Sequence, residues 1–136
     1  MSFLTWIKGM CGAVCGLASY VWGGLDGMLT ALIICILIDY VTGVCAAAYQ
    51  GKLNSSTGFR GIIKKVVILL IVAVAYTIGH AVGMDSIRDL VIGFYIANEG
   101  ISIMENAGRM NVPVCKQLSR VLEQLKEEFE EKEPEE

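Results

Sequence analysis

Residues 27–49 read GMLTALIICILIDYVTGVCAAAY, and Asp39 is the one charged side chain among them. A helix of about 20 apolar residues crosses the hydrocarbon core of a bilayer, so this stretch predicts a membrane span. Gly43, Ala46 and Ala47 follow Asp39 at helical spacings, so one face of the helix is small and carries a carboxylate. Such a face packs against another helix or lines a polar lumen.

Further apolar stretches extend this pattern over most of the chain. Of its 136 residues 54% are hydrophobic, and the mean hydropathy is +0.57. Residues 62–82 predict a second span. Residues 3–24 are apolar and glycine-rich, with Trp6 and Trp22 of a type favoured at membrane interfaces. That segment either lies on the membrane or crosses it, and little chain remains for a soluble catalytic domain.

Basic residues between the two spans indicate the orientation of the chain. Arg60, Lys64 and Lys65 follow the polar connection and are expected to anchor this loop in the cytoplasm by the positive-inside rule. Arg109 follows the third apolar stretch. A third span near residues 87–107 would bring Arg109 back to the same side, which predicts a cytoplasmic C-terminus.

The third stretch is apolar but carries polar residues, and residues 94–106 read FYIANEGISIMEN. A carboxylate at membrane depth usually faces a protein interior or a water-filled cavity. At about 100° per residue, its polar side chains gather on roughly 120° of a helix surface. This polar face of the expected helix comprises Tyr95, Asn98, Glu99, Ser102, Glu105 and Asn106.

Three interpretations of this polar face remain open. The helix could lie in the interface with its polar side in water. It could contribute polar contacts inside a helical bundle. It could also be a span whose polar face lines an aqueous lesion formed by several copies. A single chain has too few helices to surround a wide channel, so a pore requires an oligomer.

The C-terminal part, residues 108–136, has a different composition. Residues 113–136 hold eight acidic and four basic residues, whereas residues 1–112 hold six acidic and seven basic. Neither part is a basic nucleic-acid surface, so no nucleic-acid partner is expected. A soluble amphipathic helix is predicted from the spacing of its apolar residues, ending in an acidic, disordered tail. These apolar residues are Leu118, Val121, Leu122, Leu125 and Phe129.

No arrangement of residues indicates catalysis or a cofactor. The five cysteines are odd in number and include no C-x-x-C pair, so they indicate neither a disulfide framework nor a metal site. His80 is the single histidine and lies at the end of an apolar stretch. We therefore expect no enzyme activity, no metal and no cofactor.

Several short motifs follow one another along the chain. They are DYVTG (39–43), GKLNSS (51–56), GFRG (58–61) followed by Lys64 and Lys65, FYIANE (94–99), Ser102-Ile103 and Glu105-Asn106. This ordered set resembles the phage lysis and toxin-secretion holins, including those of clostridia and their phages. The resemblance covers residues 29–125, most of the chain. After Asn106 the family tends to have a glycine and a proline pair, whereas this chain has one proline there, Pro113.

The resemblance implies an integral protein of the bacterial inner membrane that assembles with itself in the bilayer and opens a lesion. A cell-wall hydrolase, or in some relatives a large toxin, leaves the cytoplasm through that lesion. It implies no enzyme activity and no cofactor. A small multi-span ion channel or transporter subunit is the alternative, and an adaptor that recruits a partner through its C-terminal helix is a third class.

The expected fold is an all-α integral membrane protein with three parts. They are an apolar N-terminal helix (1–26), a transmembrane core (27–107) with spans near 27–49, 62–82 and 87–107, and a cytoplasmic helix with an acidic tail (108–136). The residues expected to line the lesion or to form the assembly are Asp39, Thr42, Gly43, Tyr95, Asn98, Glu99, Ser102, Glu105 and Asn106.

Overall fold

The computed structural model describes residues 2–131, and every regular element in that part of the chain is an α-helix. The predicted all-α fold class is therefore confirmed. The end of the expected acidic tail, residues 132–136, lies outside the described residues. In chain order the helices are α1 (Phe3–Trp22), α2 (Gly27–Tyr49), α3 (Ser55–Val82), α4 (Ser86–Arg109) and α5 (Lys116–Glu131).

Polar side chains fix where α2 and α3 begin. The Asp26 carboxylate accepts a hydrogen bond from the Leu29 amide at 3.0 Å, and the Asn54 side chain accepts one from the Ser56 amide at 2.9 Å. Each satisfies an amide that the first turn of a helix leaves without a partner. Because Asn54 caps α3, that helix begins in the polar connection, ahead of the apolar stretch that starts at residue 62.

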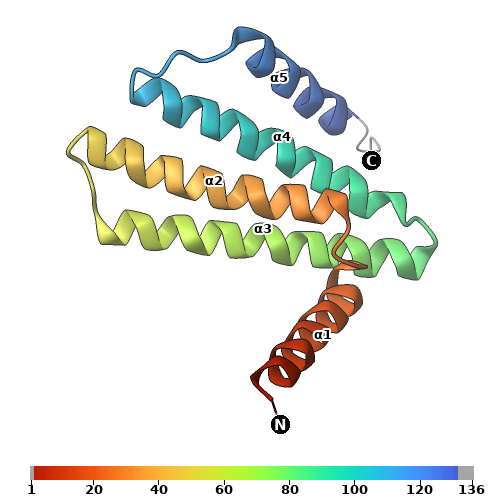
Figure 1. The fold of residues 1–136 in the computed structure, drawn as a ribbon. Coiled ribbons are helices and arrows are strands. Elements are labelled where there is room, and N and C mark those ends of the chain that lie inside the picture. The colour runs from red at the N-terminus through yellow and green to blue at the C-terminus, as the bar shows by residue number, and fades with distance from the viewer. Residues whose placement is uncertain (1, 132–136) are drawn as a thin grey trace.

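The helices pack side by side around α4, as Figure 1 shows. α2 and α3 run antiparallel, α4 lies along α2, and α5 returns along the outer side of α4. α1 points away from this bundle at an angle and contacts α3. The buried apolar core lies between α2, α3 and α4 and consists of Leu29, Leu32, Ile36, Val72 and Ile92.

A tight turn joins α3 to α4. Gly83 ends α3 in the left-handed conformation with φ 74°, and the Met84 amide donates to the Gly79 carbonyl at 2.7 Å. This pattern satisfies carbonyls at the C-terminal end of a helix. A Cβ on Gly79 would lie 2.7 Å from the Met84 carbonyl oxygen, so the turn needs glycine there.

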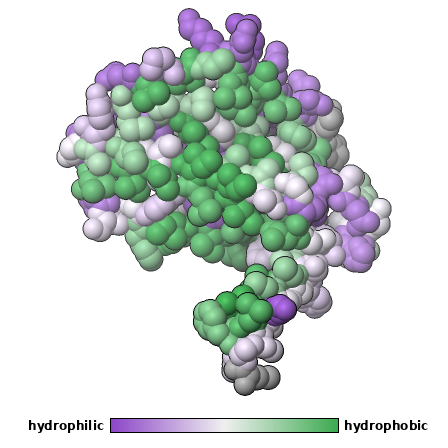
Figure 2. Space-filling view, viewed as in Figure 1, coloured by the Kyte–Doolittle hydropathy of each residue, from purple (hydrophilic) through white to green (hydrophobic). Residues whose placement is uncertain are grey.

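Glycines on α4 bring α5 unusually close. A Cβ on Gly100 would lie 2.8 Å from Leu122 Cδ2, and a Cβ on Gly93 would overlap the Phe129 ring. α5 therefore does not project freely from the bundle. Leu122 and Phe129 pack on α4, whereas Leu118 and Val121 of the predicted apolar stripe are 46% and 49% exposed. Hydrophilic side chains gather along the top edge of Figure 2, where α5 lies.

Among residues 2–131, three helices are long and apolar enough to cross a membrane, and they are α1, α2 and α3. Long apolar side chains on them are exposed: Leu37 and Val41 on α2 are 60% and 59% exposed, and Phe3 on α1 is 81% exposed. Figure 2 shows a broad apolar area on the face of the bundle in view. An apolar surface of this extent marks contact with lipid or with another protein.

α4 is not among these three helices because polar residues lower its hydropathy. The predicted span at residues 87–107 thus depends on shielding of those residues by the neighbouring helices, and it stays a prediction. α1 satisfies the length and apolarity of a span, but that alone leaves open whether it crosses the bilayer.

Candidate functional site

Three charged residues occupy equivalent depths on three helices. Asp39 lies ten residues before Tyr49, the last residue of α2, and Lys65 lies ten residues after Ser55, the first residue of α3. Glu99 likewise lies ten residues before the last residue of α4. At 1.5 Å per residue, each is about 15 Å from the same end of the bundle.

These residues form one ion cluster, defined as Asp39, Lys65 and Glu99. The Lys65 ammonium pairs with Asp39 Oδ2 and with Glu99 Oε2. The Asp39 and Glu99 side chains are 8% and 2% exposed, and Lys65 is 17% exposed. The cluster holds two carboxylates for one ammonium, so it links α2, α3 and α4 with a formal charge of −1.

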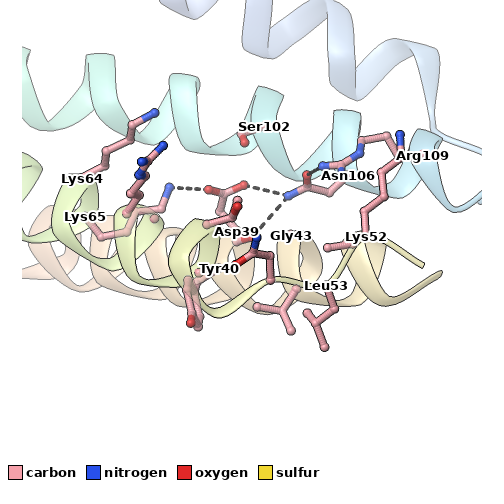
Figure 3. Close-up of a pocket in the computed structure, with 17 residues that line it drawn as sticks. Asp39, Tyr40, Gly43, Lys52, Leu53, Lys64, Lys65, Ser102, Asn106 and Arg109 are labelled. Atoms are coloured by element: carbon pink, nitrogen blue, oxygen red, sulfur yellow. Dashed lines mark hydrogen bonds and ion pairs between the residues drawn. The ribbon is translucent and has the colours of Figure 1, made fainter. Parts of the chain in front are cut away.

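Asn106 completes the cluster from the next turns of α4. Its side-chain amide donates to Asp39 Oδ1 at 3.0 Å and to Thr42 Oγ1 at 3.1 Å, and it lies against Gly43 (Figure 3). Arg109 in turn donates to Asn106 Oδ1 at 3.3 Å. Hydrogen bonds to a carboxylate are stronger than those between neutral groups, so Asn106 offsets part of the excess negative charge.

The network is fully satisfied within the described part of the chain. In residues 2–131 no buried side-chain nitrogen or oxygen lacks a hydrogen-bond partner. Removing one member of a buried ion pair costs about 3–5 kcal/mol, because its partner remains as an uncompensated charge. The cluster can therefore hold three helices in register inside an apolar bundle. Lipid chains offer its charged groups no hydrogen bonds, so water is the medium that could replace these contacts.

A second polar cluster lies at the opposite end of α4. The Arg88 guanidinium binds both oxygens of Asp26, at 2.7 and 3.1 Å, and donates to Asp89 at 2.8 Å. It also donates to the carbonyls of Trp22 and Gly24, so it ties the connection between α1 and α2 to α4. Arg88 holds the pKa of Asp26 below its ordinary value, mainly through these hydrogen bonds.

The structure brings only some of the expected lining residues together. Asp39, Thr42, Gly43, Glu99 and Asn106 meet at the ion cluster. Tyr95 instead packs against the apolar core and meets the Phe94 ring edge-on. Partly or fully exposed positions on α4 are Asn98, Ser102 and Glu105.

The three residues expected to anchor the loop have different surroundings in the structure. Arg60 and Lys64 are exposed, whereas Lys65 belongs to the ion cluster. Glu99 and Asn106 thus make polar contacts inside the bundle. This matches the interpretation in which the polar face of α4 contributes contacts within a helical bundle. Whether the expected residues line a lesion in an assembly stays a prediction.

Sequence reasoning missed two partners that the structure reveals. Lys65 was grouped with Arg60 and Lys64 as a loop anchor by the positive-inside rule, and its equal depth with Asp39 and Glu99 became visible only with the observed bounds of α2, α3 and α4. The contact between Arg88 and Asp26 had no signal in the sequence either. It depends on how the connection between α1 and α2 folds over the end of α4.

Comparison with known proteins agrees with this arrangement. The profile of the bacteriophage holin family matches residues 16–127, which include all of α2, α3 and α4. This chain belongs to the bacteriophage holin family. It is 43% identical over 112 residues to an uncharacterised protein of Listeria innocua, covering 82% of this chain and 78% of the relative.

This chain also covers most of the length of two further relatives. An uncharacterised 14.9 kDa protein of Clostridium perfringens is 39% identical over 111 residues, covering 80% of this chain and 84% of the relative. An uncharacterised Bacillus subtilis protein is 29% identical over 116 residues, covering 85% and 87%. No solved structure matches the chain. Family membership supports a holin-like, non-enzymatic membrane protein.

Proposed function

We propose that this protein is a holin that assembles with itself in the bacterial inner membrane. The assembly opens a lesion that lets a cell-wall hydrolase or a toxin leave the cytoplasm. The observation that carries the proposal is the match of residues 16–127 to the bacteriophage holin family. The ion cluster of Asp39, Lys65 and Glu99 on three helices of a bundle with an apolar exterior supports it.

In the resting protomer the cluster keeps α2, α3 and α4 together. Charged groups are costly in hydrocarbon, so separating these helices in lipid would expose unpaired charges. The closed bundle is therefore the stable form while each protomer is surrounded by lipid. The protein can accumulate in this form without permeabilising the membrane.

Assembly requires surface that is free for other copies. Gly12 and Gly16 on α1 would have nothing within 4 Å of an added Cβ, so this side of α1 is uncovered. Small residues four apart allow two helices to approach closely in a membrane. α1 thus offers a contact for a second copy without disturbing the bundle.

Opening exchanges the intramolecular contacts of α4 for water. Glu99 and Asn106 face α2 and α3 in the protomer, and Glu105 on the same helix is already exposed. When many copies surround an aqueous space, water can hydrate these groups, which removes the penalty of separating them in lipid. The polar face of α4 then lines the lesion, with the basic end of the bundle toward the cytoplasm.

Co-expression with a cell-wall hydrolase that has no export signal tests the proposal. We expect abrupt lysis only when the hydrolase and this protein are both present. Controls are the hydrolase alone, this protein alone, and this protein with a catalytically dead hydrolase. Gradual growth arrest without release of the active hydrolase would contradict the proposal.

Two rival functions predict different outcomes in the same cells. A small ion channel or transporter, which the buried charges of the ion cluster would also suit, predicts selective ion flux and no passage of macromolecules. An adaptor that works through α5 predicts that deletion of residues 113–136 abolishes lysis. The lesion proposal predicts that this deletion changes the time of lysis instead.

A further inference from the structure

A cavity of about 580 Å³ opens where α2 ends, α3 begins and α4 ends (Figure 3). Its wall is strongly basic, and among residues 2–131 it includes a single carboxylate, that of Asp39. Polar uncharged residues such as Thr57 and Ser102, and apolar residues such as Val44, also line it. Its cationic side chains are Lys52, Arg60, Lys64, Lys65 and Arg109.

Most of this positive charge is uncompensated. Lys65 is neutralised by the ion cluster, and Arg109 donates to the neutral side chains of Asn106 and Gln50. Within residues 2–131, the exposed side chains of Lys52, Arg60 and Lys64 have no carboxylate partner. Four cationic groups thus face one cavity against the −1 charge of the ion cluster, and the resulting net charge of +3 suits an anionic ligand.

The first turn of α3 adds to this positive potential. Asn54, Thr57 and Gly58 line the cavity at the N-terminal end of a 28-residue helix. The aligned peptide dipoles place partial positive charge at such an end. Phosphate oxygens accept hydrogen bonds from arginine, lysine and hydroxyl groups, so the donors present match a phosphate group.

The cavity also lies at the depth of lipid headgroups. α3 is 28 residues long, or about 42 Å at 1.5 Å per residue. The hydrocarbon core is about 30 Å thick, so α3 extends roughly 12 Å beyond it when the helix stands near the bilayer normal. The polar first turns of α3 account for that excess, and they form part of the cavity wall.

An apolar track leads from the cavity toward the middle of the membrane. Val44 lines the cavity, and Val41 and Leu37 lie three and seven residues before it on the same face of α2. Both of these side chains are well exposed, at 59% and 60%. An acyl chain can follow this face, whereas a free phosphate ion would make no use of it.

We propose that this cavity binds the phosphate headgroup of an anionic phospholipid from the cytoplasmic leaflet. The cations at the mouth hold the phosphate, and an acyl chain runs along Val41 and Leu37. Basic pockets between membrane helices on the cytoplasmic side are suited to such headgroups. The proposal requires membrane insertion but not lesion opening, so the two can fail separately.

Lipid binding to the full chain in a non-ionic detergent tests this inference. Native mass spectrometry counts bound lipid during titration with phosphatidylglycerol, with phosphatidylcholine and, separately, with inorganic phosphate as a competitor. We expect at least tenfold tighter binding of phosphatidylglycerol than of phosphatidylcholine. We also expect that preference to weaken as salt rises, and phosphate at equal concentration to displace little lipid.

A matched pair of variants assigns the preference to the cavity. Lys52→Gln/Arg60→Gln removes one lysine and one arginine from its mouth, and Lys116→Gln/Arg120→Gln removes the same two residue types from α5. We expect the first variant to lose at least fivefold of the preference and the second to keep it. Circular dichroism checks that both remain helical.

Three results would overturn the inference. Equal affinities of the wild-type protein for the two lipids would exclude recognition of an anionic headgroup. Equal losses in the two variants would show a general charge effect instead of a site. If inorganic phosphate displaced the bound lipid as effectively as added lipid does, the cavity would be a site for a free anion. That result would contradict the role of the apolar track.

Discussion

The Lys65 ammonium on α3 forms an ion pair with the Glu99 carboxylate on α4, whose side chain is only 2% exposed. The same ammonium pairs with Asp39 on α2, so a single cation joins three helices. Each helix alone would carry an unpaired charge into the membrane, whereas the three together carry a satisfied cluster. The closed bundle is thus favoured as one unit.

Replacement of Lys65 should destabilise the protein strongly. Lys65→Met leaves two buried carboxylates facing each other without a cation, and breaking a buried pair costs about 3–5 kcal/mol. Denaturant unfolding in detergent, followed by circular dichroism, measures the free energy of unfolding. Lys64→Met is the control and should change it by less than about 0.5 kcal/mol, because Lys64 is exposed.

Neutralising the two carboxylates should rescue this variant. Lys65→Met combined with Asp39→Asn and Glu99→Gln leaves no buried charge at the cluster, and it should recover most of the lost free energy. No recovery would show that Lys65 stabilises the bundle through packing of its aliphatic stem instead of through its charge.

The contact between Asp26 and Arg88 should make stability depend on pH. Arg88 holds the pKa of Asp26 below its ordinary value, so the folded protein binds this proton less readily than the unfolded chain. The stability that this pair contributes is present above the unfolded-state pKa of about 3.9 and is lost as pH falls through the lower folded-state value. Because the Asp26 side chain is 50% exposed, we expect about 1 kcal/mol.

Asp26→Asn isolates this effect. At pH 7 the variant should have the lower melting temperature, and the difference from wild type should shrink as pH falls below about 4. Thermal unfolding in detergent across this range measures both proteins. Asparagine can still cap α2 through its side-chain oxygen, so the substitution removes mainly the charge. A difference that is constant with pH would show that the charge of Asp26 does not explain the variant.

Close packing of α5 on α4 should depend on Gly100. A Cβ there would lie 2.8 Å from Leu122 Cδ2, so Gly100→Leu should push α5 away and cost about 1–3 kcal/mol. Arg120 is already exposed, so the effect of displacement would be local unfolding of α5, which lets trypsin cleave its backbone after Arg120 and Lys126. We expect at least tenfold faster cleavage of α5 in detergent-solubilised protein.

Gly108→Leu is the matched control because an added Cβ at Gly108, also on α4, would have nothing within 4 Å. Its α5 should be cleaved at the wild-type rate. If both variants were cleaved equally fast, a general loosening of α4 would explain the result better than a contact between Gly100 and Leu122.

The apolar helices of the fold can be predicted from the sequence because hydropathy determines where they lie. The predicted span 27–49 coincides with α2, whose long apolar run ends in polar residues on both sides. α3 begins at Ser55, before the apolar stretch at residue 62, because Asn54 caps a helix that continues through polar residues. Hydropathy marks the part of a helix that lipid can surround, and capping marks where the helix begins.

Only part of the candidate site could be predicted from the sequence. The helical period places Glu99 and Asn106 on one side of α4, and both turn toward α2 and α3. Which cation pairs with Glu99 depends on how α3 is aligned along α4. The helical period of a single helix does not give that alignment. The position of α5 likewise could not be predicted from the sequence. Its charged composition suggested a soluble helix, and nothing in the sequence indicated which helix packs against the glycines of α4.

Lysis timing of Glu99→Leu tests the central claim, that the polar face of α4 forms the lesion, most directly. The substitution leaves Lys65 paired with Asp39, so the bundle should still fold and insert. The measurement is the lysis time of cells that express a cytoplasmic cell-wall hydrolase, with Ile103→Leu on the apolar side of α4 as control. The account predicts late or absent lysis at wild-type membrane levels of Glu99→Leu, and normal lysis of the control. Lysis of Glu99→Leu at the wild-type time would contradict it.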